Sequence, residues 1–263
     1  MANINSSRYL LYGAGELLLV IVGILIALRI DNWNEERIEQ IEIREFAMNL
    51  SAAIDRDTEM LAPVEMQIRA SMRQAEELAN YLRDRSIDEI DNAELFFLTT
   101  HIGYRPYSWS RAAIEQLKSA GGLRKMRNKE LAQRISDYDA LTQHLDQDYQ
   151  EDEQSARSVL DSMSQLIDLN YSSAGLEDYL QWNDGFTAAD IERRLTRFRE
   201  SDEFRQLAEQ KRPLLSQNIA EFRRLANINR NFANSTRARP DIELPRLRRF
   251  AAEIQELIDK EYR

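Results

Sequence analysis

The chain has 263 residues, of which 43% are hydrophobic and 30% charged, as expected of a folded protein and not of a disordered tail. Its formal net charge of -10 argues against a general nucleic-acid binder, which needs surplus Lys and Arg to displace counterions from phosphates. The lack of Cys excludes disulfides, zinc-thiolate sites and thiol catalysis, and only 8 Gly and 5 Pro favour an all-α fold over a turn-rich β fold.

Residues 9–30 predict a single transmembrane helix. The apolar run LLLVIVGILIAL follows one charged residue, Glu16, and about 20 helical residues span the core of a bilayer. Tyr9 and Tyr12 at one end and Trp33 beyond the other suit the interfacial aromatic belt. Because the apolar region is long and is followed by a poor cleavage site, we expect an uncleaved anchor in the lipid bilayer and not a signal peptide.

The opening segment, YLLYGAGELLLVIVGILIALRIDNWNEER, resembles that of an uncharacterised family of bacterial single-pass membrane proteins. The family pattern is Tyr-Leu-x-Tyr, Gly-Glu and Gly-Ile-x-Ile-Ala, followed by Asn-Trp-Asn-Glu. It is matched here by Tyr9, Leu10, Tyr12, Gly15, Glu16, Gly23, Ile24, Ile26, Ala27, Asn32, Trp33, Asn34 and Glu35. The likeness covers 29 of the 263 residues, with a weaker stretch in IEQLKSAGGLRKMRNKELAQRI. The family brings no known activity.

The side of the membrane follows from two signals that disagree. Arg8 stands before the span, against Arg29, Arg37 and Arg44 after it, and this count favours a cytoplasmic C-terminal part. The resemblance implies a cytoplasmic N-terminus and an exported C-terminal part, although family members usually carry a more basic N-terminal tail. We expect a bacterial inner-membrane protein with a periplasmic C-terminal part.

One stripe of the span predicts association between helices. At about 100° per residue, Gly23, Ala27 and Asn34 fall within roughly 20° of Glu16, and we group Gly15 with them as an assembly face. Small residues allow helices to approach closely, and a carboxyl group on that stripe faces a partner instead of lipid. Glu16 has two interpretations: a structural carboxyl, or a proton- or ion-handling group in a channel or energy-coupling subunit.

The rest of the chain predicts an elongated antiparallel helical bundle. We divide the chain into a tail (1–8), the transmembrane helix (9–30), a juxtamembrane helix (31–62) and a soluble bundle (63–263). Pro63 either kinks one continuous helix or opens a new one.

Shorter helices are expected in the first half of the bundle. We expect Asn92 to be the N-cap of a helix that runs through Thr100. We expect Ser108 or Ser110 to be the N-cap of a second helix that reaches Ser119. Gly121 and Gly122 provide the C-terminal stop of that helix.

The clearest pattern begins after Asn128, a predicted N-cap. Heptad positions are mostly apolar or aromatic at 131, 135, 138, 142, 145, 149, 152, 156, 159, 163, 166 and 170, which predicts a helix of about 40 residues with a buried seam. Thr187 with Asp190 resembles a capping box. Ser201 opens another long helix, interrupted by Pro213, with a buried face at Phe204, Leu207, Leu215, Phe222, Leu225 and Phe232. A final helix follows Pro245.

Candidate chemistry is sparse. Asp137, His144 and Asp148 share one helical face and could offer a metal three ligands, but a helix rich in Asp produces such triplets by chance. No Gly-rich phosphate loop, nucleophile elbow or HExxH motif is present in the sequence. We therefore expect no metal, no cofactor, no catalytic residue and no enzymatic activity.

Two surfaces have both a functional and a structural interpretation. A basic cluster could dock an acidic partner, a phosphate or a lipid headgroup, or could simply balance a helix C-terminus; it comprises Lys118, Arg124, Lys125, Arg127 and Lys129. The aromatic residues Tyr104, Tyr107 and Trp109 form either a recognition loop or a packed end of the bundle.

These patterns favour a non-enzymatic, membrane-anchored helical protein that forms homo-oligomers or joins another membrane protein and scaffolds a complex. No nucleic-acid partner is expected. The alternative is a channel or ion-coupling subunit that uses Glu16. A periplasmic ligand sensor that signals through a partner is a third option.

Overall fold

The computed structural model describes residues 4–99, 102–171 and 188–262, with side chains from Gly13 onward in the first helix. Within those ranges the chain is helical apart from short connections, and it contains no strand, only an isolated β-bridge between Ile167 and Leu214. The predicted all-α fold class is confirmed.

The first helix, α1, runs unbroken from Ile4 to Arg83, over 80 residues. Pro63 lies inside it and opens no new helix. Every side chain in residues 13–38, which we call the projecting segment, is exposed, whereas Ile43 is the first of many buried apolar residues along the same helix. Packing therefore begins about 20 residues before Pro63, and no break separates the juxtamembrane part from the bundle.

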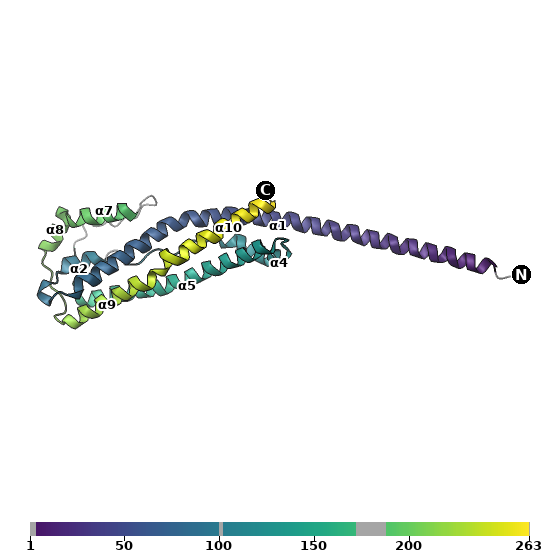
Figure 1. Ribbon diagram of the computed structural model, residues 1–263. Helices are drawn as coiled ribbons and strands as arrows, with labels where there is room; N and C mark the ends of the chain where they lie inside the picture. The colour runs from purple at the N-terminus through teal and green to yellow at the C-terminus, as the bar shows by residue number, and fades with distance from the viewer. Residues whose placement is uncertain (1–3, 100–101, 172–187, 263) are drawn as a thin grey trace.

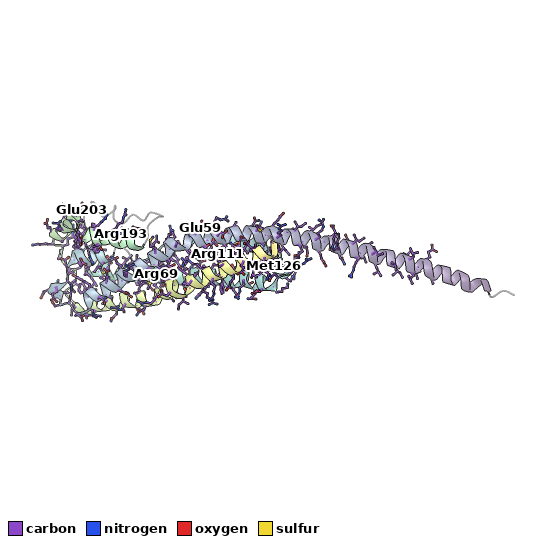
Figure 2. The ribbon with its side chains drawn as sticks, turned by 45° about the horizontal axis from the view of Figure 1, so that its top comes forward. Glu59, Arg69, Arg111, Met126, Arg193 and Glu203 are labelled. Atoms are coloured by element: carbon purple, nitrogen blue, oxygen red, sulfur yellow. The ribbon has the colours of Figure 1, made fainter. Side chains whose placement is uncertain are left out.

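The projecting segment stands clear of the other elements, as its side chains show in Figure 2. It includes the apolar part of α1, which is long and apolar enough to cross a membrane. Trp33, near the end of that part, is 65% exposed.

The remaining helices pack along the other half of α1 (Figure 1). After a 3-10 turn, η1 (Ile87–Glu89), the chain turns back through α2 (Asn92–Thr99) and α3 (Arg111–Ser119). It then passes through α4 (Gly122–Lys125) and runs outward again along α5 (Lys129–Leu166). Two shorter helices, α7 (Ala188–Arg199) and α8 (Asp202–Glu209), lie at the far end. The return leg comprises α9 (Ile219–Thr236), a π-helical turn η2 (Arg239–Glu243) and α10 (Leu244–Tyr262).

The buried side chains form two large apolar clusters, one in each half of the bundle. The proximal core, nearer the projecting segment, includes Leu50, Leu131, Tyr138, Leu247 and Ile254. The distal core includes Leu82, Phe97, Val159, Phe198 and Phe222. Of the eleven predicted seam positions within α5, ten are buried and Tyr149 is partly buried, which confirms the heptad pattern. Position 170 lies beyond the end of α5.

The long helix predicted from Ser201 is wrong, because the chain is split into α8 and α9. Lys211 adopts a left-handed conformation (φ 46°), and Pro213 cannot supply the backbone N–H that a continuing helix needs. Leu215, expected on the buried face, is 58% exposed, and its N–H donates to the Leu166 carbonyl (2.8 Å). A new cap at Asn218 then starts α9.

The predicted boundaries at Ser119, Gly121, Asn128 and Ser201 are confirmed, and the one at Asn92 is wrong. The Asn128 side chain accepts from Leu131 N at 3.0 Å, and Gly121, with φ 66°, follows the end of α3. Asn92 does not cap α2, because Asp91 accepts from Glu94 N at 2.9 Å instead. Ser110 precedes α3 without a side-chain cap. Thr100 and Thr187 lie outside the described residues.

Candidate functional site

A layer of charged residues lies between the two cores. On α5, Asp152 takes a seam position that the apolar pattern would fill with a hydrophobic residue, and it is 3% exposed. From the opposite side, η2 contributes Arg239 and Glu243, which lie four residues apart. The central polar layer, as we call it, comprises Tyr104, His144, Asp148, Asp152, Arg239 and Glu243.

Asp152 is the best satisfied of the three carboxylates. Arg239 approaches both of its oxygens, with Nε 3.2 Å from Oδ2 and Nη2 3.4 Å from Oδ1. Tyr104 donates its hydroxyl to Oδ2 at 2.8 Å, from the connection between α2 and α3. Burial raises the pKa of Asp152, and the hydrogen bond from Tyr104 and the charge of Arg239 oppose that shift.

The guanidinium of Arg239 also lies near the carboxylates of Asp148 and Glu243. The guanidinium lies 3.5 Å from Asp148 Oδ1 and 3.5 Å from Glu243 Oε1. His144 Nε2 lies 3.3 Å from Asp148 Oδ2 and 3.7 Å from Glu243 Oε1. Burial raises the pKa of Glu243, with Arg239 opposing. Asp148 Oδ2 and Glu243 Oε2 are buried and accept no hydrogen bond from a described residue.

The π-helical turn has a local cause in the sequence. Pro240 has no N–H, and neither does Pro245, so two consecutive turns each lose a backbone donor. The N–H of Leu244 bonds to the Arg239 carbonyl, five residues earlier, which is the π pattern. Such turns are common at functional sites. This one carries two of the layer's charged residues.

The aromatic connection between α2 and α3 packs onto the bundle. Tyr107 is buried and stacks on Trp109 with ring centroids 5.0 Å apart, and Tyr104 meets Tyr149 edge-on at 5.4 Å. The Trp109 indole donates to Asp146 Oδ1 at 2.7 Å. The packing interpretation of these aromatic residues therefore holds.

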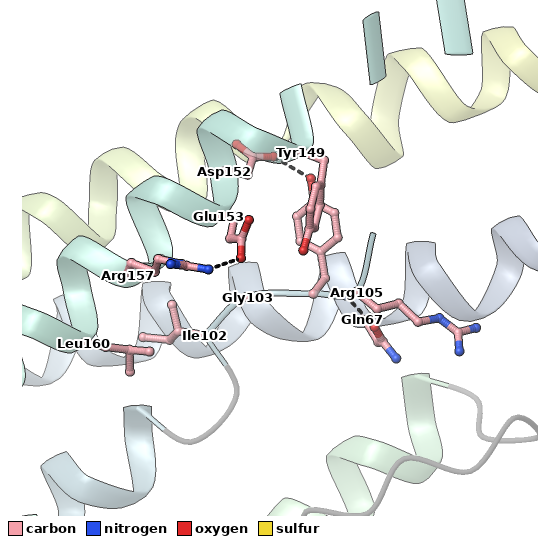
Figure 3. A pocket seen from close by; sticks show the side chains of 11 residues that line it. Gln67, Ile102, Gly103, Arg105, Tyr149, Asp152, Glu153, Arg157 and Leu160 are labelled. Atoms are coloured by element: carbon pink, nitrogen blue, oxygen red, sulfur yellow. Dashed lines mark hydrogen bonds and ion pairs between the residues drawn. The ribbon is translucent and has the colours of Figure 1, made fainter. Parts of the chain in front are cut away.

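A cavity of about 420 Å³ opens beside the layer (Figure 3). It is lined by Gln67 of α1, the 102–105 connection and one face of α5. Gln67 accepts from Arg105 N at 3.0 Å, and at the rim Arg157 pairs with Glu153 at 2.6 Å. With Asp152 in its wall, the cavity offers charged and aromatic groups to a small polar molecule.

Three of the five basic residues predicted as a patch are already engaged. Lys118 pairs with Asp139 and Lys125 with Glu39 of α1, each at 2.8 Å. Lys129 donates to a backbone carbonyl, that of Arg124, at 2.8 Å. The side chains of Arg124 and Arg127 are exposed. This turn is thus fastened to α1 where the projecting segment leaves the bundle.

The predicted assembly residues all lie on the projecting segment. Glu16, Gly15, Gly23, Ala27 and Asn34 are exposed, and a Cβ placed on either glycine would meet no described atom within 4 Å. Asn34 accepts from Arg37 within the same helix at 3.3 Å. The side chains of the predicted interface residues Tyr9 and Tyr12 lie outside the described ones.

Of the His144 triplet considered from the sequence, only two members meet. His144 and Asp148 come together with Glu243, whereas Asp137 accepts from Gln133 at 2.8 Å and lies near Arg134. Glu243 is about 100 residues further along the chain, so helical periodicity could not identify it.

Other members of the layer were also missed from the sequence. Asp152 carried a visible signal, as an acid in an apolar seam, whereas Tyr104 was singled out only as one of three aromatic residues and Arg239 carried no signal. Comparisons of the chain with protein-family models, curated proteins and solved structures find no match.

Proposed function

We propose that this chain is a non-enzymatic, membrane-anchored helical-bundle protein that self-associates through its anchor and holds a partner or a membrane complex with its bundle. The observation that carries this proposal is the continuity of α1, which contains both the apolar span and the longest helix of the bundle. An unbroken helix resists bending and twisting because its successive backbone hydrogen bonds would have to break. The span and the bundle therefore keep a fixed orientation relative to each other.

The exposed apolar surface supports placement in a bilayer. Large apolar side chains from Leu17 to Ile30 are between 43% and 75% exposed, and a continuous surface of this kind is stable only against lipid or protein. Trp33 follows at the position expected for an interfacial anchor. The resemblance of this segment to bacterial single-pass proteins supports the inner membrane, with the bundle in the periplasm.

The stripe of Glu16, Gly23 and Ala27 supports self-association. A carboxyl group in hydrocarbon is costly unless it faces a polar partner, and small residues beside it allow a second backbone to approach. The stripe continues to Asn34 in the juxtamembrane part. A second copy of α1, or another membrane helix, would satisfy Glu16.

Oligomeric state in nanodiscs tests the proposal, with mass measurement and identification of co-purifying proteins. We expect the wild type to be oligomeric or bound to a membrane protein, and Ala27→Leu to dissociate it. Ala14→Leu makes the same small-to-large change about 140° around the helix from Ala27 and is expected to leave assembly intact. A monomeric wild type without any membrane partner contradicts the proposal.

Glu16→Gln separates the structural role of Glu16 from the channel alternative. Loss of assembly in this variant supports the structural role. Intact assembly with loss of a proton or ion flux measured in the wild type supports a channel or coupling subunit instead.

The cavity beside the polar layer favours a second candidate, a ligand sensor. Gln67 of α1 lines it, so a bound molecule would contact the helix that enters the membrane. Thermal melting with a library of small polar metabolites tests this, since a ligand that binds the folded state raises the melting temperature. Stabilisation lost in Ala156→Leu, which fills the cavity, supports a sensor; stabilisation unaffected by that change contradicts it.

A further inference from the structure

We propose that His144, Asp148 and Glu243 form a binding site for one divalent transition-metal ion of the zinc type. The donor atoms already have suitable spacing. His144 Nε2 is 3.3 Å from Asp148 Oδ2 and 3.7 Å from Glu243 Oε1, and one donor atom from each residue lies within 4.8 Å of the others. Four donors arranged tetrahedrally at about 2.1 Å from zinc are about 3.4 Å apart. A metal ion would thus need only small side-chain movements.

The second observation is an unsatisfied buried oxygen. Asp148 is 7% exposed, and its Oδ2, the atom nearest His144, accepts no hydrogen bond from a described residue. Glu243 Oε2 is buried and equally unsatisfied. Leaving buried carboxylate oxygens without a partner is costly, and a bound cation would satisfy them.

The charge balance points the same way. The central polar layer holds three carboxylates against the single guanidinium of Arg239, which leaves a formal charge of -2 when His144 is neutral. Asp152 takes the closest contacts with Arg239 and the hydrogen bond from Tyr104. Asp148 and Glu243 are therefore undercompensated, and a divalent ion supplies the missing charge.

The site is accessible and its donors are selective. The His144 side chain is 55% exposed, so an ion could enter from solvent and keep water in its remaining positions. One imidazole nitrogen with two carboxylates suits zinc and its neighbours, whereas Mg²⁺ and Ca²⁺ prefer all-oxygen sites. The bound ion would tie α5 to η2 in the middle of the bundle.

Calorimetric titration of the full chain in detergent, after chelator treatment, tests the site. We expect one Zn²⁺ per chain, a raised melting temperature with Zn²⁺, and no comparable effect of Mg²⁺. His144→Ala and Glu243→Gln should each weaken Zn²⁺ binding by at least about 10-fold. Gln147→Ala is the matched control, because Gln147 is exposed and lies about one helical turn from His144 on α5. This variant should bind Zn²⁺ as the wild type does.

Folding of the variants is checked by their melting in chelator. Because His144 is largely exposed, His144→Ala should melt in chelator close to the wild type. Lack of stoichiometric Zn²⁺ binding by the wild type overturns the proposal, as does unchanged affinity in His144→Ala. If Zn²⁺ does not bind and Glu243→Gln raises stability, Asp148 and Glu243 share a proton and the metal site is refuted.

Discussion

Arg239 is the residue on which the charge balance of the central polar layer depends. It lies 3.2 to 3.5 Å from oxygens of Asp148, Asp152 and Glu243, and only 9% of its side chain is exposed. Removing one partner of a buried ion pair leaves an uncompensated charge, which costs far more than the pair itself contributes.

Arg239→Ala is therefore expected to lower the free energy of unfolding by about 3–5 kcal/mol, measured by urea denaturation in detergent. Arg157→Ala is the control, because Arg157 pairs with Glu153 at the surface and its loss should change little. Equal stability of the two variants would contradict the assigned role of Arg239.

Glu94 predicts a specific pH dependence at the far end of the bundle. Burial raises its pKa, against the opposing charge of Arg199, with which it pairs. The folded state thus binds the Glu94 proton more tightly than the unfolded chain, whose Glu pKa is about 4.3. The stability contributed by this proton is fully present below the pKa of Glu94 in the unfolded chain. It is lost as pH rises through the pKa of Glu94 in the folded protein.

The direction of this pH dependence is tested by measuring the free energy of unfolding of the wild type and of Glu94→Gln at about ten pH values between about 3.5 and 7. We expect the wild type to lose stability relative to the variant as pH rises. Glu89→Gln serves as an opposite control, because hydrogen bonds from Ser86 lower the pKa of Glu89. The contribution of Glu89 to stability is present above its pKa in the unfolded chain and is lost as pH falls through its lower pKa in the folded protein.

At the scale of elements, helix caps give a direct test. The Asn128 side chain satisfies a backbone donor at the start of α5, whereas Ser110 makes no such bond before α3. Asn128→Ala should destabilise the protein by about 1 kcal/mol, and Ser110→Ala should cost less. Thermal unfolding of both variants measures the difference. A larger loss in Ser110→Ala would be inconsistent with these cap geometries.

The helix positions that sequence predicted best are those set by local interactions. The cap at Asn128, the glycine stop at Gly121 and the α5 seam each depend on residues within a turn or two of one another. Pro213 was a local signal for the break between α8 and α9. The length of the break could not be predicted locally, because the backbone N–H of Leu215 bonds to the carbonyl of Leu166, at the end of α5.

Competition between neighbouring side chains decided the other misplaced boundary. Asp91 and Asn92 are both good N-caps, so propensity alone could not choose between them. Asn92 is committed to tertiary contacts, since it donates to the Pro213 carbonyl at 2.7 Å and accepts from Tyr171 at 3.1 Å. Only the folded arrangement shows those partners.

At the scale of the whole molecule, the bundle is expected to fold without the projecting segment. Residues 13–38 are exposed, whereas Glu39 pairs with Lys125 and Ile43 enters the core. A fragment of residues 39–263 should be soluble and match the full chain in unfolding free energy within about 0.5 kcal/mol. A fragment of residues 56–263 lacks Ile43, Leu50 and Ile54 and should fail to fold, as circular dichroism would show.

The sequence predicted the all-α class and a span-forming helix because both are properties of composition and periodicity. It could not predict which helices meet. The residues of the polar layer lie on α5, η2 and the connection between α2 and α3, so no single segment contains the site.

The polar layer also sets the axial alignment of the helices. Apolar seams alone align almost as well after a slip of one heptad, which moves a helix by about 10 Å. Such a slip of α5 would place Leu145 or Val159 opposite Arg239, where Asp152 now lies, and would bury its charge among methyl groups. One axial position of α5 relative to η2 is therefore far more stable than its neighbours, and the same charges hold α5 in register with the return leg of the bundle.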